Sequence, residues 1–503
     1  MLSRRRFLAT SAVGAAGAGT LVLAGCDREP TPATVQVPAL DPNDWASVRA
    51  QFALRDGVAN LTTFVFASHP ASVRAAIERH RAGLDADPYG YLGANESTLD
   101  EAVLAAAAAY LGTEPNRIAL TDSTTMGLGL LYSGLHLAPD DEVLTTEHDF
   151  YSTHESLRLR ALRDGATVRR VRLYDEPEQA DADQIVSRLV AALTSRTRVV
   201  AITWVHSSSG VRLPVRALAD ALAQANAARE PGQRALLCVD GVHGFGIEDA
   251  GPDQLGCDFL VSGGHKWLFG PRGTGFIWGR PEAWARHTPI IPTFSGDPDG
   301  PPGAFATPGG YHSFEHRWAL AEAFGLHQTI GRARIAARSH ALAARLKEGL
   351  AGIGAVRLRT PRSADLSAGI VCCEVDGYTA REAVAKLRPT GVWASATPYT
   401  PKPEIPRMNS TPIFRSVSCM AVRIAGMCTG PRLIAGRFSS VPNGITAMGI
   451  SANRTAIKGA RNQNTLFTWE GIMSSLVISL MTSASGCRRP WGPTRRGPTR
   501  NWM

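Results

Sequence analysis

The sequence lacks several patterns that would assign it at once to a class of protein. Its eight cysteines include no Cys-Xaa-Xaa-Cys pair of the kind that binds zinc. The best apolar run near the C-terminus, Gly471 to Met481, is too short to span a membrane. Before residue 400, no cluster of Lys and Arg with aromatic residues indicates a nucleic-acid-binding face. We therefore expect neither a metal site nor a nucleic-acid partner.

Acidic residues are almost absent from the last fifth of the chain. Residues 400–503 contain 14 Lys and Arg but two Asp and Glu, whereas the residues before them contain 39 and 42. The formal net charge of +9 is therefore concentrated in this segment, and the body of the chain is mildly acidic. Folded surfaces normally mix both signs of charge. We interpret 400–503 as an aberrant basic tail, frame-shifted or otherwise foreign, and expect weakly packed or disordered structure there.

The first 25 residues have the pattern of a targeting segment. Ser3–Leu8, with three arginines followed by Phe and Leu, precedes a weakly apolar run rich in small residues and resembles a twin-arginine export signal. The run ends in Leu23–Cys26, which resembles a lipoprotein signal-peptidase site. We expect export by the twin-arginine route to a periplasmic or other extracytoplasmic location, a lipid anchor at Cys26, and a Pro-rich linker over 26–45.

Short apolar runs bounded by turn residues alternate with helical stretches from about residue 46 to 310. The runs predict strands at Glu142–Thr146, Val168–Leu173, Arg198–Val205, Ala235–Val239, Asp258–Ser262 and Gly275–Trp278, with helices at Ala102–Leu111, Ala182–Leu193 and Leu213–Asn226 among them. This alternation predicts an α/β fold with a large, mostly parallel sheet, whose ligands bind at the carboxyl ends of its strands. A long amphipathic helix over 314–350 then leads into a smaller C-terminal domain.

Chemically distinctive residues follow two of these strands. Asp240 ends a buried strand, where an unpaired carboxylate is costly and should have a partner. The next strand leads into Ser262-Gly-Gly-His265-Lys266-Trp267 and then Gly270–Gly275, so an apolar strand delivers a lysine into a glycine-rich bend. Taken singly, each feature has an ordinary explanation, such as a solvated lysine or a helix-capping aspartate. Their arrangement together is much more specific.

This arrangement resembles the class V aminotransferases, a family of fold-type-I enzymes dependent on pyridoxal 5′-phosphate (PLP) that includes cysteine desulfurases and isopenicillin N epimerase-like proteins. The resemblance extends from about Asn60 to Tyr399, and the His265–Trp267 and Gly-Pro-Arg-Gly-Thr-Gly segments are most similar to the epimerase-like branch. It implies a large PLP-binding domain over 46–310, a long helix and truncated α+β small domain over 311–399, and chemistry at the α-carbon of a small amino-group substrate.

The resemblance also implies roles for individual residues. Lys266 corresponds to the Schiff-base lysine, and Asp240 to the carboxylate that keeps the pyridinium nitrogen protonated. His243 takes the place of the residue that bonds the phenolic oxygen of the cofactor. Ser207 stands where many members have an Asn with a related role. His148, after the strand that ends at residue 146, corresponds to the residue that stacks on the cofactor ring.

The phosphate site is expected at Leu120–Gly127, where a short strand meets a helix. Backbone N–H groups, the hydroxyls of Ser123-Thr124-Thr125 and the helix dipole suit a dianion, although an ordinary Ser/Thr helix cap explains the segment equally well on local evidence. The resemblance favours the phosphate, with Thr125 as the contacting threonine and His265 and Ser262 completing the site. It also implies a homodimer, in which the segment containing Thr307 reaches the neighbouring phosphate.

The motifs leave the reaction open. Cys372 and Cys373 lie in a strand-like run, where burial should make them inert, so a cysteine desulfurase is disfavoured. Transamination, racemisation and lyase chemistry share deprotonation by Lys266. Segments 60–70 and 85–95 are candidates for the substrate entrance. The alternative is a catalytically impaired, lipid-anchored binding protein, because the arginine that binds the substrate carboxylate in this family would fall in the basic tail, where Arg407 is a candidate by position alone.

Overall fold

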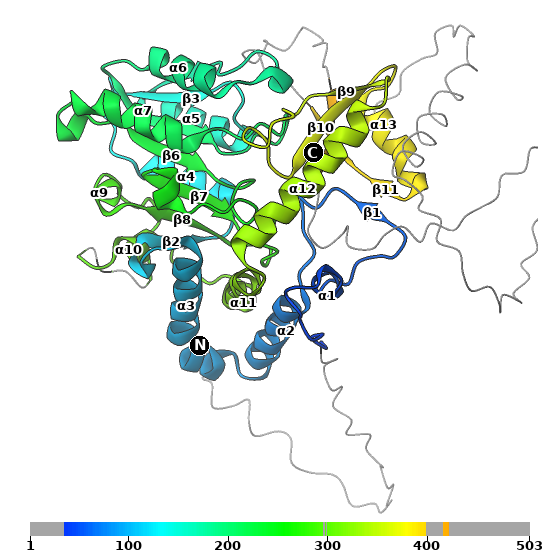
Figure 1. Ribbon diagram of the computed structural model, residues 1–503. Helices are drawn as coiled ribbons and strands as arrows, with labels where there is room; N and C mark the ends of the chain where they lie inside the picture. Colours follow the sequence, from blue (N-terminus) through cyan, green and yellow to red (C-terminus); the bar gives the residue numbers. More distant parts are fainter. Residues whose placement is uncertain (1–34, 295–296, 298, 399–415, 422–503) are drawn as a thin grey trace, which may run out of the picture. The chain divides into compact units, whose positions relative to one another are not determined.

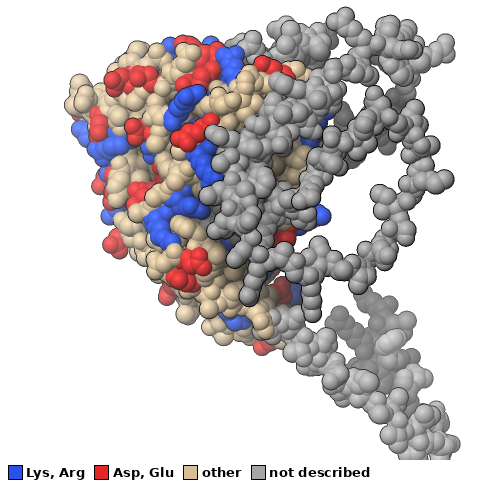
Figure 2. Space-filling model, turned by 45° about the vertical axis from the view of Figure 1, so that its right-hand side comes forward, with Lys and Arg blue, Asp and Glu red and all other residues tan. Residues whose placement is uncertain are grey.

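The computed structural model describes residues 35–294, 297, 299–398 and 416–421, with backbone alone for 397–398 and 416–421. The predicted export signal, Cys26, Tyr399, Arg407 and most of the basic tail lie outside the described residues. Among the described residues, no helix combines the length and the apolar character needed to cross a membrane. Basic and acidic side chains are interspersed on the face of the body shown in Figure 2.

The central element of the described part is a seven-stranded sheet (Figure 1). Its order is β2 (Ile118–Thr121), β8 (Gly275–Gly279), β7 (Phe259–Gly263), β6 (Leu236–Asp240), β5 (Thr197–Thr203), β3 (Glu142–Thr146) and β4 (Thr167–Val171). The five strands from β7 to β4 are parallel to one another, and β8 is antiparallel to both of its neighbours, β7 and β2. The predicted mostly parallel α/β sheet is confirmed, with all six predicted strands present.

Helices cover both faces of this sheet, which explains why its central strands β5, β6 and β7 are buried along their whole length. Along β5, Val200 and Ile202 join one hydrophobic cluster while Val199 and Ala201 join the other. The first cluster includes residues of α3 (Pro88–Leu111), α6 (Ala182–Ala192), α7 (Val215–Ala227) and α11 (Phe314–Ile330); the second includes residues of α4 (Thr124–Gly134) and α5 (Tyr151–Asp164). Buried strand residues therefore alternate between two cores.

Two helices differ from their predicted bounds. The helix predicted over 314–350 is two, α11 and α12 (Arg332–Ala351), because Gly331 adopts a φ of 92° that breaks the first helix and that other residues rarely reach. The helix predicted at 102–111 begins much earlier, since Asp87 accepts a hydrogen bond from Gly90 N and Pro88 stands in the first turn. Segment 85–95 is therefore largely helical.

A separate sheet has four antiparallel strands, in the order β12 (Ser395–Pro398), β13 (Ser416–Ala421), β10 (Ile370–Val375) and β9 (Val356–Leu358). It packs with α12 and α13 (Ala380–Leu387), the latter started by a Thr379/Glu382 capping box. β13 falls inside the tail where we expected weakly packed or disordered structure, and its backbone pairing with β12 and β10 shows that disorder was the wrong expectation for these six residues.

The remaining elements are short. β1 (Ala59–Asn60) pairs in parallel with β11 (Val392–Trp393), so a segment near the start of the body lies beside one near its end. The other helices of the described part are α1 (Trp45–Ala50), α2 (Ala71–Ala86), α8 (Pro252–Leu255), α9 (Pro281–Trp284) and α10 (Pro302–Ala306). The predicted domain boundaries remain predictions.

Candidate active site

The predicted site residues follow the carboxyl ends of neighbouring parallel strands. Asp240 is the last residue of β6, and Lys266 follows β7 by three residues. His148 follows β3, and Ser207 follows β5. Because these four strands lie side by side in the order β7, β6, β5, β3, the topology brings their ends to one edge of the sheet.

Lys266 contacts a histidine whose protonation can be deduced from its other partner. The Lys266 Nζ lies 3.2 Å from His243 Nε2, and Trp267 Nε1 donates a hydrogen bond of 3.2 Å to His243 Nδ1. Burial holds the pKa of His243 well below its usual range, so the ring is neutral and carries one proton. Since Nδ1 accepts from an indole that can only donate, that proton is on Nε2 and points to Lys266. This arrangement requires an uncharged amine.

The pKa of Lys266 is shifted in the direction that this assignment needs, and the pKa of Asp240 is shifted as well. Burial lowers the pKa of Lys266 to about 8, against an opposing effect of the Asp240 carboxylate. Asp240 is 1% exposed, and burial raises its pKa to about 6. Its Oδ1 accepts from Val242 N at 3.1 Å, while its Oδ2 has no hydrogen-bond partner among the described residues. A protonated pyridine nitrogen is the kind of donor that would complete this carboxylate.

The predicted phosphate site begins a helix of 11 residues, α4. Ser123 caps it by accepting from Met126 N, and the hydroxyl of buried Thr124 has no partner in the described part of the chain. A Cβ on Gly263 would lie 3.0 Å from Thr124 Oγ1 and 3.2 Å from His265 Nδ1, so these two side chains converge over a glycine. Burial lowers the pKa of His265 to about 4. This cradle fits a phosphate group.

Other residues of the predicted phosphate site have different surroundings. Thr125 is exposed on the first turn of α4. The hydroxyl of Ser262 is buried inside β7 and donates to the Gly263 carbonyl at 3.4 Å. The hydroxyl of Thr307 accepts from Leu120 N at 3.1 Å and donates to the Gly303 carbonyl at 2.9 Å. Ser262 and Thr307 therefore hold local structure, and a phosphate contact would replace or share these bonds.

His148 is packed against a residue that sequence reasoning missed. Its ring stacks on that of Tyr174 with a centroid separation of 3.8 Å and an interplanar angle of 9°. Burial lowers the pKa of His148 to about 3, so the ring is neutral. The Tyr174 hydroxyl lies 2.8 Å from Nδ1 of His206, which directly precedes Ser207. The second histidine, three residues after β5, was a usable sequence signal. Tyr174, three residues after β4, had no such signal.

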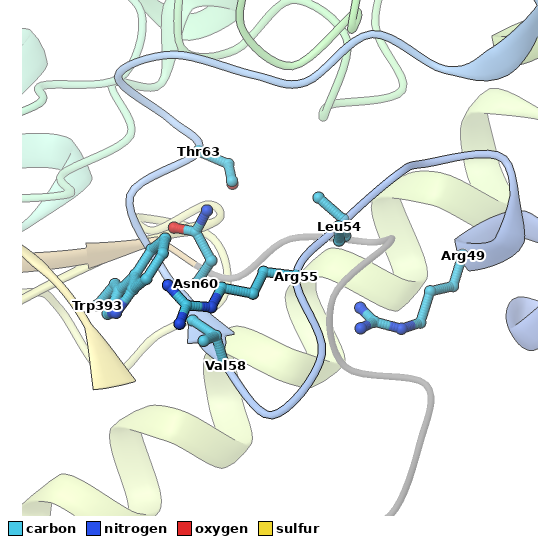
Figure 3. A pocket seen from close by; sticks show the side chains of 7 residues that line it. All are labelled: Arg49, Leu54, Arg55, Val58, Asn60, Thr63 and Trp393. Atoms are coloured by element: carbon cyan, nitrogen blue, oxygen red, sulfur yellow. The ribbon is translucent and has the colours of Figure 1, made fainter. Parts of the chain in front are cut away.

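A small hollow lies beside the segment predicted to form the substrate entrance (Figure 3). Its volume is about 30 Å³, and it is lined by Arg49, Leu54, Arg55, Val58, Asn60, Thr63 and Trp393. Arg55 extends toward Asn60 and Trp393. Thr63 is 4% exposed, and its hydroxyl has no partner among the described residues. The next residue, Phe64, has its ring centroid 6.0 Å from that of His243, so the segment that lines the hollow continues past the site.

Comparison with solved structures defines the class of fold. A structure of the cystine C–S lyase C-DES, with glycine covalently linked to its PLP cofactor, aligns with a TM-score of 0.65 at 21% identity. The alignment covers 75% of this chain and 95% of that one. The chain therefore has the fold of a fold-type-I PLP-dependent enzyme.

The family follows from the sequence match. The model of the aminotransferase class-V family matches residues 92–417, and the chain belongs to this family. The match runs past Tyr399, where we placed the end of the family-like sequence. Isopenicillin N epimerase from Streptomyces clavuligerus is 29% identical over 70% of this chain and 88% of its own length. A probable cysteine desulfurase from Pseudomonas aeruginosa is 35% identical over 34% of this chain and 39% of its own. The protein is a PLP-dependent enzyme of this family.

Proposed function

We propose that the chain moves the α-proton of an amino acid, with Lys266 as both the base and the residue to which the cofactor attaches. The observation that carries this proposal is the 3.2 Å contact of Lys266 Nζ with His243 Nε2, because the Trp267 donor on the other ring nitrogen requires an uncharged amine. An uncharged amine can attack a carbonyl group and accept a proton. When bound, PLP supplies an electron-accepting ring that stabilises negative charge at the α-carbon.

The other residues hold the cofactor in this proposal. Asp240 Oδ2 would accept a hydrogen bond from the ring nitrogen and keep a proton there, and His243 would contact the phenolic oxygen. His148 covers one face of the ring, with Ser207 nearby after β5. The phosphate would bind where Thr124 and His265 converge over Gly263, with Thr125 on the adjacent first turn of α4, Ser262 in β7, and Thr307 reaching the site of a second copy in a homodimer. The unpartnered Asp240 Oδ2 and Thr124 Oγ1 support these roles.

The reaction supported best is of the epimerase type, an α-proton exchange on a free amino acid. The relative from Streptomyces clavuligerus and the His265–Trp267 segment favour it. Desulfuration is the weaker candidate, because it needs a mobile nucleophilic cysteine and both Cys372 and Cys373 are fully buried in β10. For the substrate carboxylate we propose the hollow of Figure 3, where Arg55, the Asn60 amide and the Thr63 hydroxyl offer donors to an anion.

Export and lipid anchoring at Cys26 remain proposals from the sequence. Their support is the order of the arginines, the small-residue run and the Leu23–Cys26 segment. Fatty-acid labelling that disappears in Cys26→Ser would support the anchor, and an unlabelled parent protein would exclude it.

Borohydride reduction tests the proposed function. Reduction of the yellow, cofactor-loaded protein should fix a pyridoxyl mass on the peptide that contains Lys266, and the protein should exchange the α-proton of an amino acid for deuterium. Lys347, another buried lysine, serves as the internal control and should stay unlabelled. Label on Lys347, or no label in cofactor-saturated protein, would exclude the assignment of Lys266.

A further inference from the structure

The two faces of the His148 ring have different surroundings. Tyr174 covers one face in a parallel stack at 3.8 Å. The proposed function assigns the other face to the cofactor ring, and the inference drawn here rests on that assignment. A histidine side chain rotates about two bonds, so a useful platform needs something that fixes its tilt. Tyr174 is the only described ring stacked on His148.

Tyr174 is itself held at its hydroxyl. The side chain is 1% exposed, and its Oη lies 2.8 Å from His206 Nδ1 and 3.1 Å from Ser209 Oγ. Burial lowers the pKa of His206 to about 3, so its ring is neutral. A Tyr174 hydroxyl that donates to Nδ1 leaves the His206 proton on Nε2, which is 3.9 Å from Asp149 Oδ1. Two partners on one hydroxyl hold the far end of the tyrosine side chain in place.

The backbone that carries His148 is fixed by its neighbour Asp149. Both carboxylate oxygens of Asp149 are occupied: Oδ2 accepts from Thr146 N and Thr145 Oγ1, and Oδ1 accepts from Thr203 N, each at 2.7 Å. These bonds join the turn after β3 to the end of β5. With the backbone fixed on one side and the ring backed on the other, His148 has little freedom to tilt.

The same hydroxyl network continues to the small sheet. Ser209 O accepts from Thr360 Oγ1 at 2.7 Å, and Thr360 Oγ1 accepts from Cys372 N of β10 at 2.8 Å. Ser209 thus bonds to Tyr174 through its side chain and to Thr360 through its backbone carbonyl. Through Ser209 and Thr360, the segment after β5 is joined to β10. A network with every link made is stiffer than its single bonds.

We propose that Tyr174 is a positioning residue for the cofactor. It backs His148 and, through its bonds to His206 and Ser209, sets the plane of the histidine ring against which the PLP ring lies. It touches neither substrate nor cofactor. Loss of the backing ring should let His148 tilt, which weakens the hold on the cofactor and changes the asymmetric surroundings of the PLP ring.

The test compares two buried Tyr–His pairs in the cofactor-loaded protein. Tyr174 pairs with His206 at 2.8 Å, and Tyr110 pairs with His327 at 3.5 Å against Phe245 and Phe324, in a different part of the core. Each tyrosine is changed to Phe and to Leu. The readouts are the rate of PLP release into an apoenzyme trap and the circular dichroism of the cofactor absorption band, both of which are independent of turnover.

We expect Tyr174→Leu to release PLP about three- to tenfold faster, the range that loss of one aromatic stack gives, and to lose much of the cofactor dichroism. Tyr174→Phe, which keeps the stack, should restore most of both signals; the corresponding Tyr110 variants should leave them unchanged. In a His148→Ala background, Tyr174→Leu should have no further effect.

Unchanged release and dichroism in Tyr174→Leu would overturn the inference, as would an equal effect of Tyr110→Leu. If Tyr174→Leu does not fold, Tyr174→Met, which also removes the ring, replaces it, and additive effects of Tyr174→Met and His148→Ala would mean that the two rings act separately. Borohydride labelling of Lys266 in the parent protein keeps the two proposals apart: label without a Tyr174 effect removes this inference alone, and no label removes the proposed function.

Discussion

Two lysines of this molecule share a pKa lowered by burial but differ in what they contact. Burial lowers the pKa of Lys266, after β7, and of Lys347, in α12, to about 8. Lys266 has His243 Nε2 as its described contact. Lys347 donates to Pro361 O, Arg362 O and Ser367 Oγ at 2.6–2.9 Å. Three acceptors favour an ammonium that holds a loop, whereas one ring N–H favours a free amine. The hydrogen-bond partners therefore distinguish a lysine suited to catalysis from a structural lysine, whereas the two similar pKa values do not.

Replacing each lysine by methionine is the strongest test of this difference between the two lysines. Lys266→Met should slow α-proton exchange by at least about 10³-fold, since it removes the base, and leave the free energy of unfolding nearly unchanged. Lys347→Met should lower that free energy by about 2–4 kcal/mol, because two carbonyls and a hydroxyl lose their donor, with exchange per folded molecule nearly normal. Urea unfolding and deuterium exchange measure the two effects. The reverse pattern would refute the comparison.

A related comparison, of a buried group with an exposed one, can be made for carboxylates. Asp240 should make the stability of the apoprotein depend on pH. Burial raises its pKa from 3.8 to about 6, so between these values the folded apoprotein holds a proton that the unfolded chain has released. Asp240 therefore makes the apoprotein less stable as the pH rises from about 4 to 6, by roughly 3 kcal/mol for two pKa units. Asp240→Asn should remove this slope in urea unfolding at pH 4.5 and 6.5. Exposed Asp220 supplies the control, since Asp220→Asn should retain it.

Replacement of Trp267 should have the smallest effect of these variants. It tests the assignment of the His243 proton to Nε2. In Trp267→Phe, Nδ1 loses its donor, the ring can carry its proton there, and Nε2 can accept from a charged Lys266. The pKa of Lys266 should then rise, shifting the pH dependence of its reaction with added PLP upward by about 0.5–1 unit. Trp278→Phe, which removes a buried indole that donates to Thr113, should cause no shift. A shift in both variants would indicate a general effect of core disruption.

The sequence was informative where a reactive residue directly follows a recognisable strand. Asp240 and Lys266 stand directly after apolar runs, and the parallel order of β6 and β7 brings the ends of those runs together, as expected. The fold class and family were predicted from the same residues. Thr124, with its hydroxyl buried at the start of α4, was also in a segment that the sequence singled out.

The sequence was uninformative where the decisive contact lies between distant segments. Tyr174 acquires its proposed role from a stack with His148 and bonds to His206 and Ser209, none of which is near it in the chain. The break at Gly331 was missed because helices often tolerate a single glycine, and only its φ of 92° reveals the end. The strand at 416–421 was missed because we inferred weak structure from the charge composition of the tail. Charge composition does not determine whether a backbone segment pairs with neighbouring strands.

That strand has a consequence for the order in which the chain can fold. β13 lies between β12 and β10, and it is the last of the four strands to be synthesised. Until residue 421 has emerged, β12 has no neighbour in its sheet and β10 exposes an edge of unpaired N–H and C=O groups, the kind of edge on which nascent chains pair wrongly. A chain shortened at residue 399 would keep that open edge permanently, so trimming the basic tail removes the middle strand of a sheet.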